Sequence, residues 1–188
     1  MVKGKVIVIV APSGSGKSTL IRRLKENFPE LVESVSYTTR SKRPTEENGE
    51  HYYFVSKDEF FRMKDNNEFI EWAEVHSNYY GTSKNFVQSR LDEGVNLLFD
   101  LDVQGADAFK NYFGDEAKVI FIAPPSFDEL KKRLRTRGTE ETGIINLRLE
   151  NSKKEMLRKD DYDYCVVNDD LDRAYIELNR IVKKILQE

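Results

Sequence analysis

Cysteine and histidine are scarce in this sequence: its 188 residues include one cysteine and two histidines. One cysteine excludes an intramolecular disulfide, and one thiol with two imidazoles cannot form a four-ligand zinc cluster. Long apolar runs are lacking too, since none approaches the roughly 20 residues that span a bilayer, and the N-terminal stretch is too short and strand-like for a signal peptide. We therefore expect a soluble, cytoplasmic protein with no membrane association.

A strong charge of either sign is also missing, because 30 Lys and Arg stand against 33 Asp and Glu, a net charge of −3. The distribution is uneven: residues 1–45 carry nine positive and three negative side chains, a balance of +6, so the remainder sums to −9. Affinity for long nucleic acid needs many phosphate contacts along one basic face. The pattern argues against a nucleic-acid partner and leaves room for a small phosphorylated ligand.

Short apolar, β-branched runs alternate with longer helical segments along most of the chain. Strand followed by helix, repeated, predicts an α/β fold with an open, doubly wound parallel sheet. Strands are expected at residues 5–10, 95–100, 118–123 and 164–167, and helices at residues 16–27, 103–112, 126–136 and 170–186.

The rhythm breaks after about residue 35, where Thr, Tyr, Phe and charged residues predominate. Strand-like pieces at 52–55 and 69–74 around a helical stretch at 57–66 predict an inserted mixed α/β subdomain. We assign residues 35–83 to this subdomain and residues 1–34 and 84–188 to the core. Arg137–Gly143 combine Gly, Thr and charge and are expected to form a mobile loop within a lid at about 137–150.

A glycine-rich loop follows the first expected strand and opens the first expected helix. It resembles G-x-x-x-x-G-K-[ST], in which backbone N–H groups converge on a phosphate, the lysine reaches the β- and γ-phosphates and the hydroxyl binds Mg²⁺. Ala11 replaces the first glycine, and a plain turn is the alternative interpretation. We predict nucleoside triphosphate binding by Ala11, Pro12, Ser13, Gly14, Ser15, Gly16, Lys17, Ser18 and Thr19. The loop leaves the acceptor open: water, a protein or a small phosphorylated molecule.

Two arginines lie three residues apart, Arg40 and Arg43, in the expected subdomain. Guanidinium groups bind phosphate in a bidentate way, although on the arginines alone a solvated basic loop is the favoured interpretation. The spacing T-T-R-x-x-R-x-x-E-x-x-G-x-x-Y-x-F from Thr38 to Phe54 resembles the signature of guanylate kinases. The resemblance covers roughly the whole chain and continues, in the family's order, in residues 68–72, 78–82, 100–105 and 137–140.

This resemblance implies transfer of the γ-phosphoryl group of ATP to GMP, and to dGMP, with Mg²⁺ and with ADP and GDP as products. It also implies that Ser36, Arg40, Arg43, Tyr52 and Tyr80 hold the GMP phosphate, whereas Glu71, Thr82 and Asp102 read the guanine. Chemistry supports the base readers, because a carboxylate accepts from guanine's N1–H and amino group together and a hydroxyl satisfies O6. Adenine carries an acceptor at N1, a mismatch that can discriminate by about 10⁴.

Catalysis of this transfer requires positioning and charge neutralisation rather than a general base, because the acceptor phosphate is already anionic. Lys17, Mg²⁺ and arginines would surround the transferred group. The resemblance points to Arg133, Arg137 and Arg148 as lid arginines. A solubilising basic helix is the alternative interpretation, and it fits Lys131, Lys132 and Arg135 better than these three. We expect the lid and the subdomain to close over both substrates and exclude water.

Two further residues receive roles from their place after expected strands. Asp100 lies where a doubly wound sheet places its ligands and is predicted to organise Mg²⁺ indirectly. Asn168 is predicted to contact the adenine of ATP. Two other functions remain open: a catalytically inactive guanylate-kinase-like module that binds proteins, and a P-loop kinase for another nucleotide. Monomer and homodimer are both compatible with the sequence.

Overall fold

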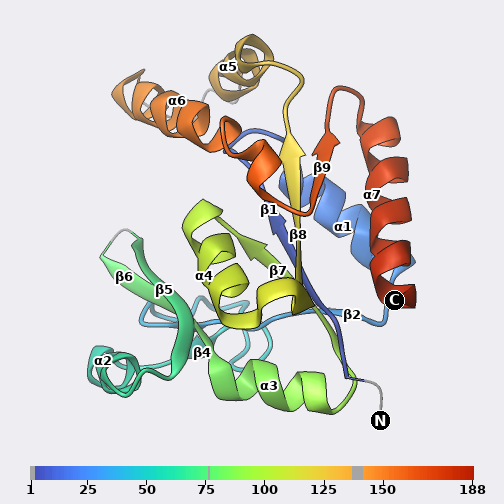
Figure 1. Ribbon diagram of the computed structural model, residues 1–188. Helices are drawn as coiled ribbons and strands as arrows, with labels where there is room; N and C mark the ends of the chain where they lie inside the picture. Colours follow the sequence, from blue (N-terminus) through green and yellow to red (C-terminus); the bar gives the residue numbers. More distant parts are fainter. Residues whose placement is uncertain (1–2, 76, 137–141) are drawn as a thin grey trace.

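The core is a parallel sheet of five strands in the order β2-β7-β1-β8-β9, seen in a computed structural model that describes residues 3–75, 77–136 and 142–188 (Figure 1). Its centre is β1, which is buried throughout because helices cover both faces of the sheet. This arrangement confirms the expected doubly wound α/β fold. The strands are β1 (Val6–Val10), β2 (Leu31–Glu33), β7 (Asn96–Leu101), β8 (Ala117–Ala123) and β9 (Tyr164–Val167).

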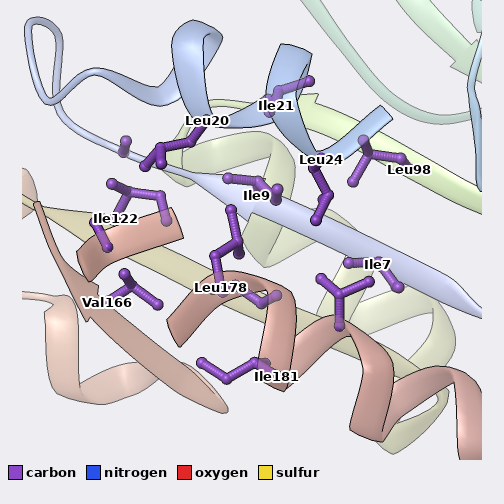
Figure 2. Packing of buried hydrophobic residues seen from close by; sticks show 14 of the residues in the cluster. Ile7, Ile9, Leu20, Ile21, Leu24, Leu98, Ile122, Val166, Leu178 and Ile181 are labelled. Carbon is purple, nitrogen blue, oxygen red and sulfur yellow. The ribbon is translucent and has the colours of Figure 1, made fainter. Parts of the chain in front are cut away.

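Two apolar layers flank the sheet. Alternate residues of β1 enter each layer: Ile7 and Ile9 pack with side chains of α1 (Lys17–Asn27) and α7 (Leu171–Gln187), as Figure 2 shows. Val6, Val8 and Val10 pack on the opposite face. The helices on that face are α3 (Lys84–Asp92) and α4 (Val103–Phe113), and beyond β8 lie α5 (Phe127–Thr136) and α6 (Thr142–Met156).

A second sheet of four strands, in the order β4-β3-β6-β5, is built from the chain between β2 and α3. Phe60 and Met63 of the neighbouring helix pack against Phe69 in a small apolar cluster of its own. This sheet occupies the stretch that was expected to form an inserted subdomain. Its elements are β3 (Tyr37–Thr38), β4 (Tyr53–Phe54), α2 (Lys57–Asp65), β5 (Phe69–Val75) and β6 (Asn78–Ser83).

Several elements differ from expectation. The first helix begins at Lys17 rather than Gly16, because Gly16 has φ 89°, in the left-handed region. β2 is too short, and α3 buries too few apolar side chains, to give a clear periodic signal. Thr142 and Gly143, expected in a loop, lie in α6, whereas residues 137–141 are outside the described ranges. Within those ranges, no helix combines the length and the apolar character needed to span a membrane.

Candidate active site

The phosphate-binding loop lies between β1 and α1, at the carboxyl end of the central strand. The loop closes on itself, since the Ser15 hydroxyl donates to the Pro12 carbonyl at 2.6 Å. A Cβ atom at Gly16 would lie 2.4 Å from Nδ2 of Asn168, so only glycine fits there. All nine residues predicted to bind ATP phosphates line one cavity of about 400 Å³, together with Asp100, Asp102 and Glu155.

Lys17 is held at the mouth of this loop by the end of β7. Its ammonium group donates to the Leu101 carbonyl at 2.9 Å and forms an ion pair with the Asp100 carboxylate. Ser18 and Asp100 also line a neighbouring cavity beside α1. A hydroxyl and one carboxylate suit Mg²⁺, which keeps several waters and binds mainly through phosphates. The described part of the chain contains no group of three or more His, Cys, Asp or Glu placed to hold a metal.

Arg40 and Arg43 are organised by a carboxylate, Glu46. Arg40 grips both its oxygens, with Nη1 to Oε2 at 3.0 Å and Nη2 to Oε1 at 2.7 Å, and the Arg43 amide donates to Oε2 at 2.8 Å. The Arg40 hydrogen bond, then the Arg43 amide, lowers the pKa of Glu46 to about 2. Sequence analysis gave Glu46 no role, although the motif contains it. The carboxylate fixes Arg40 while the Arg43 side chain stays exposed.

Aromatic rings complete this cationic corner. The Arg40 guanidinium carbon lies 5.5 Å from the centre of the Tyr52 ring, and the Tyr52 and Tyr80 rings meet edge to face at 5.8 Å. Ser36 and Tyr52 line a cavity of about 690 Å³ between the second sheet and the β2–β7 edge of the core. The structure thus brings Arg40, Tyr52 and Tyr80 together, with Ser36 on the same cavity as Tyr52.

The three predicted base readers also converge. Glu71 and Thr82 face each other across β5 and β6, and the Thr82 hydroxyl donates to Glu71 Oε1 at 2.6 Å. Burial raises the pKa of Glu71; the Thr82 hydrogen bond opposes this rise, and the negative charge of Asp102 adds to it. Asp102 caps α4 by accepting from the Gly105 amide at 2.8 Å. A carboxylate, a hydroxyl and a second carboxylate are therefore near one another.

The predicted arginines have different surroundings. Arg133 donates from Nη1 to the Asn168 carbonyl at 3.1 Å and from Nε to Glu129 Oε1 at 3.1 Å. Arg148 lies half-buried on α6, and Arg137 lies outside the described residues. Arg133 is thereby tied to Asn168, a neighbour of the phosphate loop.

The side chain of Asn168 is hydrogen-bonded to the backbone of the phosphate loop. Its Nδ2 donates to the Ser15 carbonyl at 2.7 Å, and the residue is 5% exposed. The amide nitrogen is therefore engaged by the loop backbone, a role that sequence analysis missed because it depends on contact between distant segments. The adenine contact stays a prediction.

Glu155 on α6 was also missed. It lines the phosphate-loop cavity, and its pKa is raised by burial and by Asp102, while Lys17 lowers it. Its position follows from how α6 packs, for which the sequence offers no local signal.

Comparison with known proteins gives a consistent result. The guanylate kinase family model matches residues 3–185. Guanylate kinase of Rhizobium meliloti is 46% identical over 181 residues, covering 96% of this chain and 83% of that protein. Guanylate kinase of Nitratidesulfovibrio vulgaris is 49% identical over 175 residues, 93% and 84% of the two chains. The crystal structure of guanylate kinase from Anaplasma phagocytophilum superposes with a TM-score of 0.73 at 33% identity, covering 100% of this chain and 89% of that one.

Proposed function

The chain belongs to the guanylate kinase family, and we propose how its own residues divide the work of that reaction. The protein is a nucleoside monophosphate kinase that transfers the γ-phosphoryl group of ATP to GMP, giving ADP and GDP. Transfer between two polyanions demands that both be held in line and that their charge be neutralised. Donor binding, acceptor binding and neutralisation fall to separate parts of the fold.

One observation carries this assignment: Asp100 lines both the phosphate-loop cavity and the cavity that Ser36 and Tyr52 line. The two cavities meet at the carboxyl end of β7, where an open α/β sheet places its ligands. A donor phosphate chain on the loop and an acceptor phosphate near Tyr52 would therefore approach each other across Asp100.

On the donor side, the backbone N–H groups of the loop cradle the ATP phosphates. Lys17 exchanges its contact with Asp100 for the β- and γ-phosphates. Ser18 and Asp100 would hold Mg²⁺, Asp100 indirectly; when bound, this ion neutralises charge on the phosphates. Asn168 keeps the loop in its open shape by holding the Ser15 carbonyl.

On the acceptor side, Arg40 offers the outer edge of its guanidinium group to the GMP phosphate while Glu46 fixes the rest. Arg43, Ser36, Tyr52 and Tyr80 supply the remaining donors. Glu71 accepts from guanine N1–H and the amino group, Thr82 turns its hydroxyl to O6, and Asp102 borders the same base. The raised pKa of Glu71 matters here, because only the ionised carboxylate accepts both hydrogen bonds.

Charge on the transferred group would be neutralised by Arg133, Arg137 and Arg148. Arg133 is linked to the loop through Asn168: it donates to the Asn168 carbonyl, and the Asn168 side chain donates to the Ser15 carbonyl. The two alternatives from the sequence fit less well. An inactive protein-binding module has no need of Lys17 ion-paired at the loop, and a kinase for another nucleotide would need a different base reader from the Glu71–Thr82 pair. We further propose a cytoplasmic location, which the single cysteine favours.

A coupled assay of ADP formation tests the proposal, with ATP, Mg²⁺ and GMP, dGMP, AMP, CMP or UMP as acceptor. We expect turnover with GMP and dGMP and rates near background with the other three nucleotides. Lys17→Ala serves as the inactive control. Absence of GMP-dependent ADP formation would overturn the proposed function, and equal use of AMP would overturn the base-reading roles alone.

A further inference from the structure

Arg158 lies two residues after the end of α6 and ties that end of the helix to α4. Its guanidinium group grips both oxygens of Asp107, with Nη1 to Oδ2 at 2.6 Å and Nη2 to Oδ1 at 2.9 Å. Its Nε donates to Asp161 Oδ2 at 2.9 Å, and its guanidinium carbon lies 5.5 Å from the centre of the Tyr162 ring. All five polar N–H groups of an arginine point in fixed directions, so a bidentate grip sets orientation as well as distance.

The two helices that Arg158 joins serve different sides of the reaction. α4 begins at its capping residue Asp102, proposed above to read guanine, and Asp107 lies in the following turn. α6 carries Arg148, proposed above to neutralise the transferred phosphoryl group, and Glu155, which lines the phosphate-loop cavity.

The other attachment of α6 is apolar and lies further toward its beginning. Leu149 packs with Leu130 and Leu134 of α5, which itself caps the phosphate loop: a Cβ at Gly14 would lie 3.0 Å from the Leu134 side chain. Figure 1 shows α6 running from beside α5 back toward the core strands. A polar cavity of about 350 Å³ separates α6 from the start of α4, and Arg158 stands on its wall with Asp102 and Glu155.

We infer that Arg158 is a positioning residue for phosphoryl transfer: by gripping Asp107 it fixes the end of α6 relative to α4, so that α6 presents its side chains at a set distance from Asp102. The inference rests on the proposed roles of Asp102 and Arg148. Because reacting groups must be aligned closely, a displacement of about 1 Å can cost up to about 100-fold in rate. Under this proposal Arg158 acts through the two helices rather than by contact with either substrate.

A second ion pair that involves α4 provides a matched control. Lys110 of α4 contacts both oxygens of Asp163, in the same connection between α6 and β9, at 3.0 and 3.1 Å. The side chains of Lys110 and Asp163 are 26% and 22% exposed, whereas those of Arg158 and Asp107 are 36% and 40% exposed. Lys110 joins α4 to the strand side of the connection, beyond Arg158, and does not line the polar cavity. A contribution to folding alone would make the more buried pair at least as important.

The experiment compares Arg158→Ala, Arg158→Lys, Asp107→Asn and Lys110→Met in the full chain, by steady-state kinetics and by thermal unfolding. We expect Arg158→Ala and Asp107→Asn to lower kcat/KM for GMP about tenfold or more with KM for ATP within about twofold, because the loop is untouched. Arg158→Lys should recover part of the loss, since it keeps charge but not the fork. Lys110→Met should stay within about threefold of the parent while losing comparable thermal stability.

The double variant Arg158→Ala/Asp107→Asn should be no worse in kcat/KM than either single variant, because the two residues act as one unit. Equal loss of kcat/KM in Arg158→Ala and Lys110→Met, or full activity in Arg158→Ala, would overturn the positioning role. Because the parent protein is assayed in parallel, its failure to phosphorylate GMP would refute the proposed function separately. If Arg158→Ala does not fold, Asp107→Asn and Arg158→Lys decide the question.

Discussion

Glu71→Gln removes one charge from the proposed guanine reader and leaves its size and shape nearly unchanged. In the parent protein the Glu71 carboxylate accepts from the Thr82 hydroxyl and can accept two adjacent donors from guanine. An amide has one acceptor and one donor group, so its NH₂ would face one of guanine's N–H donors. The Glu71→Gln variant should therefore lose one hydrogen bond to guanine that no rearrangement of the side chain restores.

The size of the loss follows from that exchange. A hydrogen bond to a charged acceptor contributes about 1.5–3 kcal/mol, and leaving a buried donor unpaired costs about 1–3 kcal/mol more. The sum, about 2.5–6 kcal/mol, corresponds to roughly 10²–10⁴-fold in kcat/KM for GMP. The same amide can donate to N1 of adenine, so the preference for GMP over AMP should shrink by at least the same factor.

The same substitution should leave the stability of the fold unchanged or raise it, which separates the effect on activity from any effect on folding. Burial raises the pKa of Glu71 above its ordinary 4.5. A carboxyl with a raised pKa in the folded state binds its proton more tightly there, so its contribution to stability falls as pH rises from 4.5 through the raised value and is constant above it. Glu71→Gln has no charge to bury, and its midpoint of thermal unfolding at pH 7.5 should equal or exceed that of the parent.

The assay is ADP formation with GMP or AMP across a concentration series, paired with thermal unfolding of the same samples. Glu74→Gln is the matched control, because Glu74 lies on the same strand β5 and is exposed. An unchanged ratio of kcat/KM for GMP and AMP in a folded Glu71→Gln protein would refute the reasoning.

Three further predictions test other parts of the site. Lys17→Ala should lower kcat by about 10³-fold or more with the fold intact by circular dichroism; retention of more than a tenth of the activity would contradict its role. Asn168→Ala should raise KM for ATP and leave KM for GMP nearly unchanged, because it leaves the Ser15 carbonyl without its donor; an effect on GMP alone would place Asn168 elsewhere. Glu46→Gln should raise KM for GMP by loosening Arg40, and its loss of stability in urea should be constant above about pH 5 and shrink as pH falls from 4.5 toward about 2, where Glu46 becomes protonated in the folded parent too; a loss that persists at pH 2 would contradict the lowered pKa.

Much of the fold could be read from the sequence because its signals are local. The strand around Ile7 and Ile9 is an unbroken apolar run, as a strand covered on both faces must be, and the glycines of the phosphate loop follow it directly. Elements with weak signals were not found. β2 has three residues, and α3 buries only Val87 and Leu91, so neither shows a clear period.

In the candidate site, too, residues with a local sequence signal could be predicted and residues placed by long-range contacts could not. Motif spacing located Arg40 and the loop lysine, whereas contacts between distant segments escaped sequence reasoning. Asn168 reaches the loop because β9 ends beside β8, and Glu155 reaches it because α6 packs on α5. Glu46 is different: it lies three residues after Arg43, and its position in the motif could have indicated that a carboxylate steadies the two arginines.

The second sheet arises from one continuous stretch of chain that leaves the core after β2 and returns at α3, just before β7, the strand that pairs with β2. Under the proposed assignment, every acceptor-binding residue except Asp102 is thereby encoded in one continuous block of the gene, residues 36–82, and the donor-binding residues are encoded on either side of it. An altered acceptor preference can thus arise by replacing a single block, while the strand, loop and helix that grip ATP are inherited unchanged.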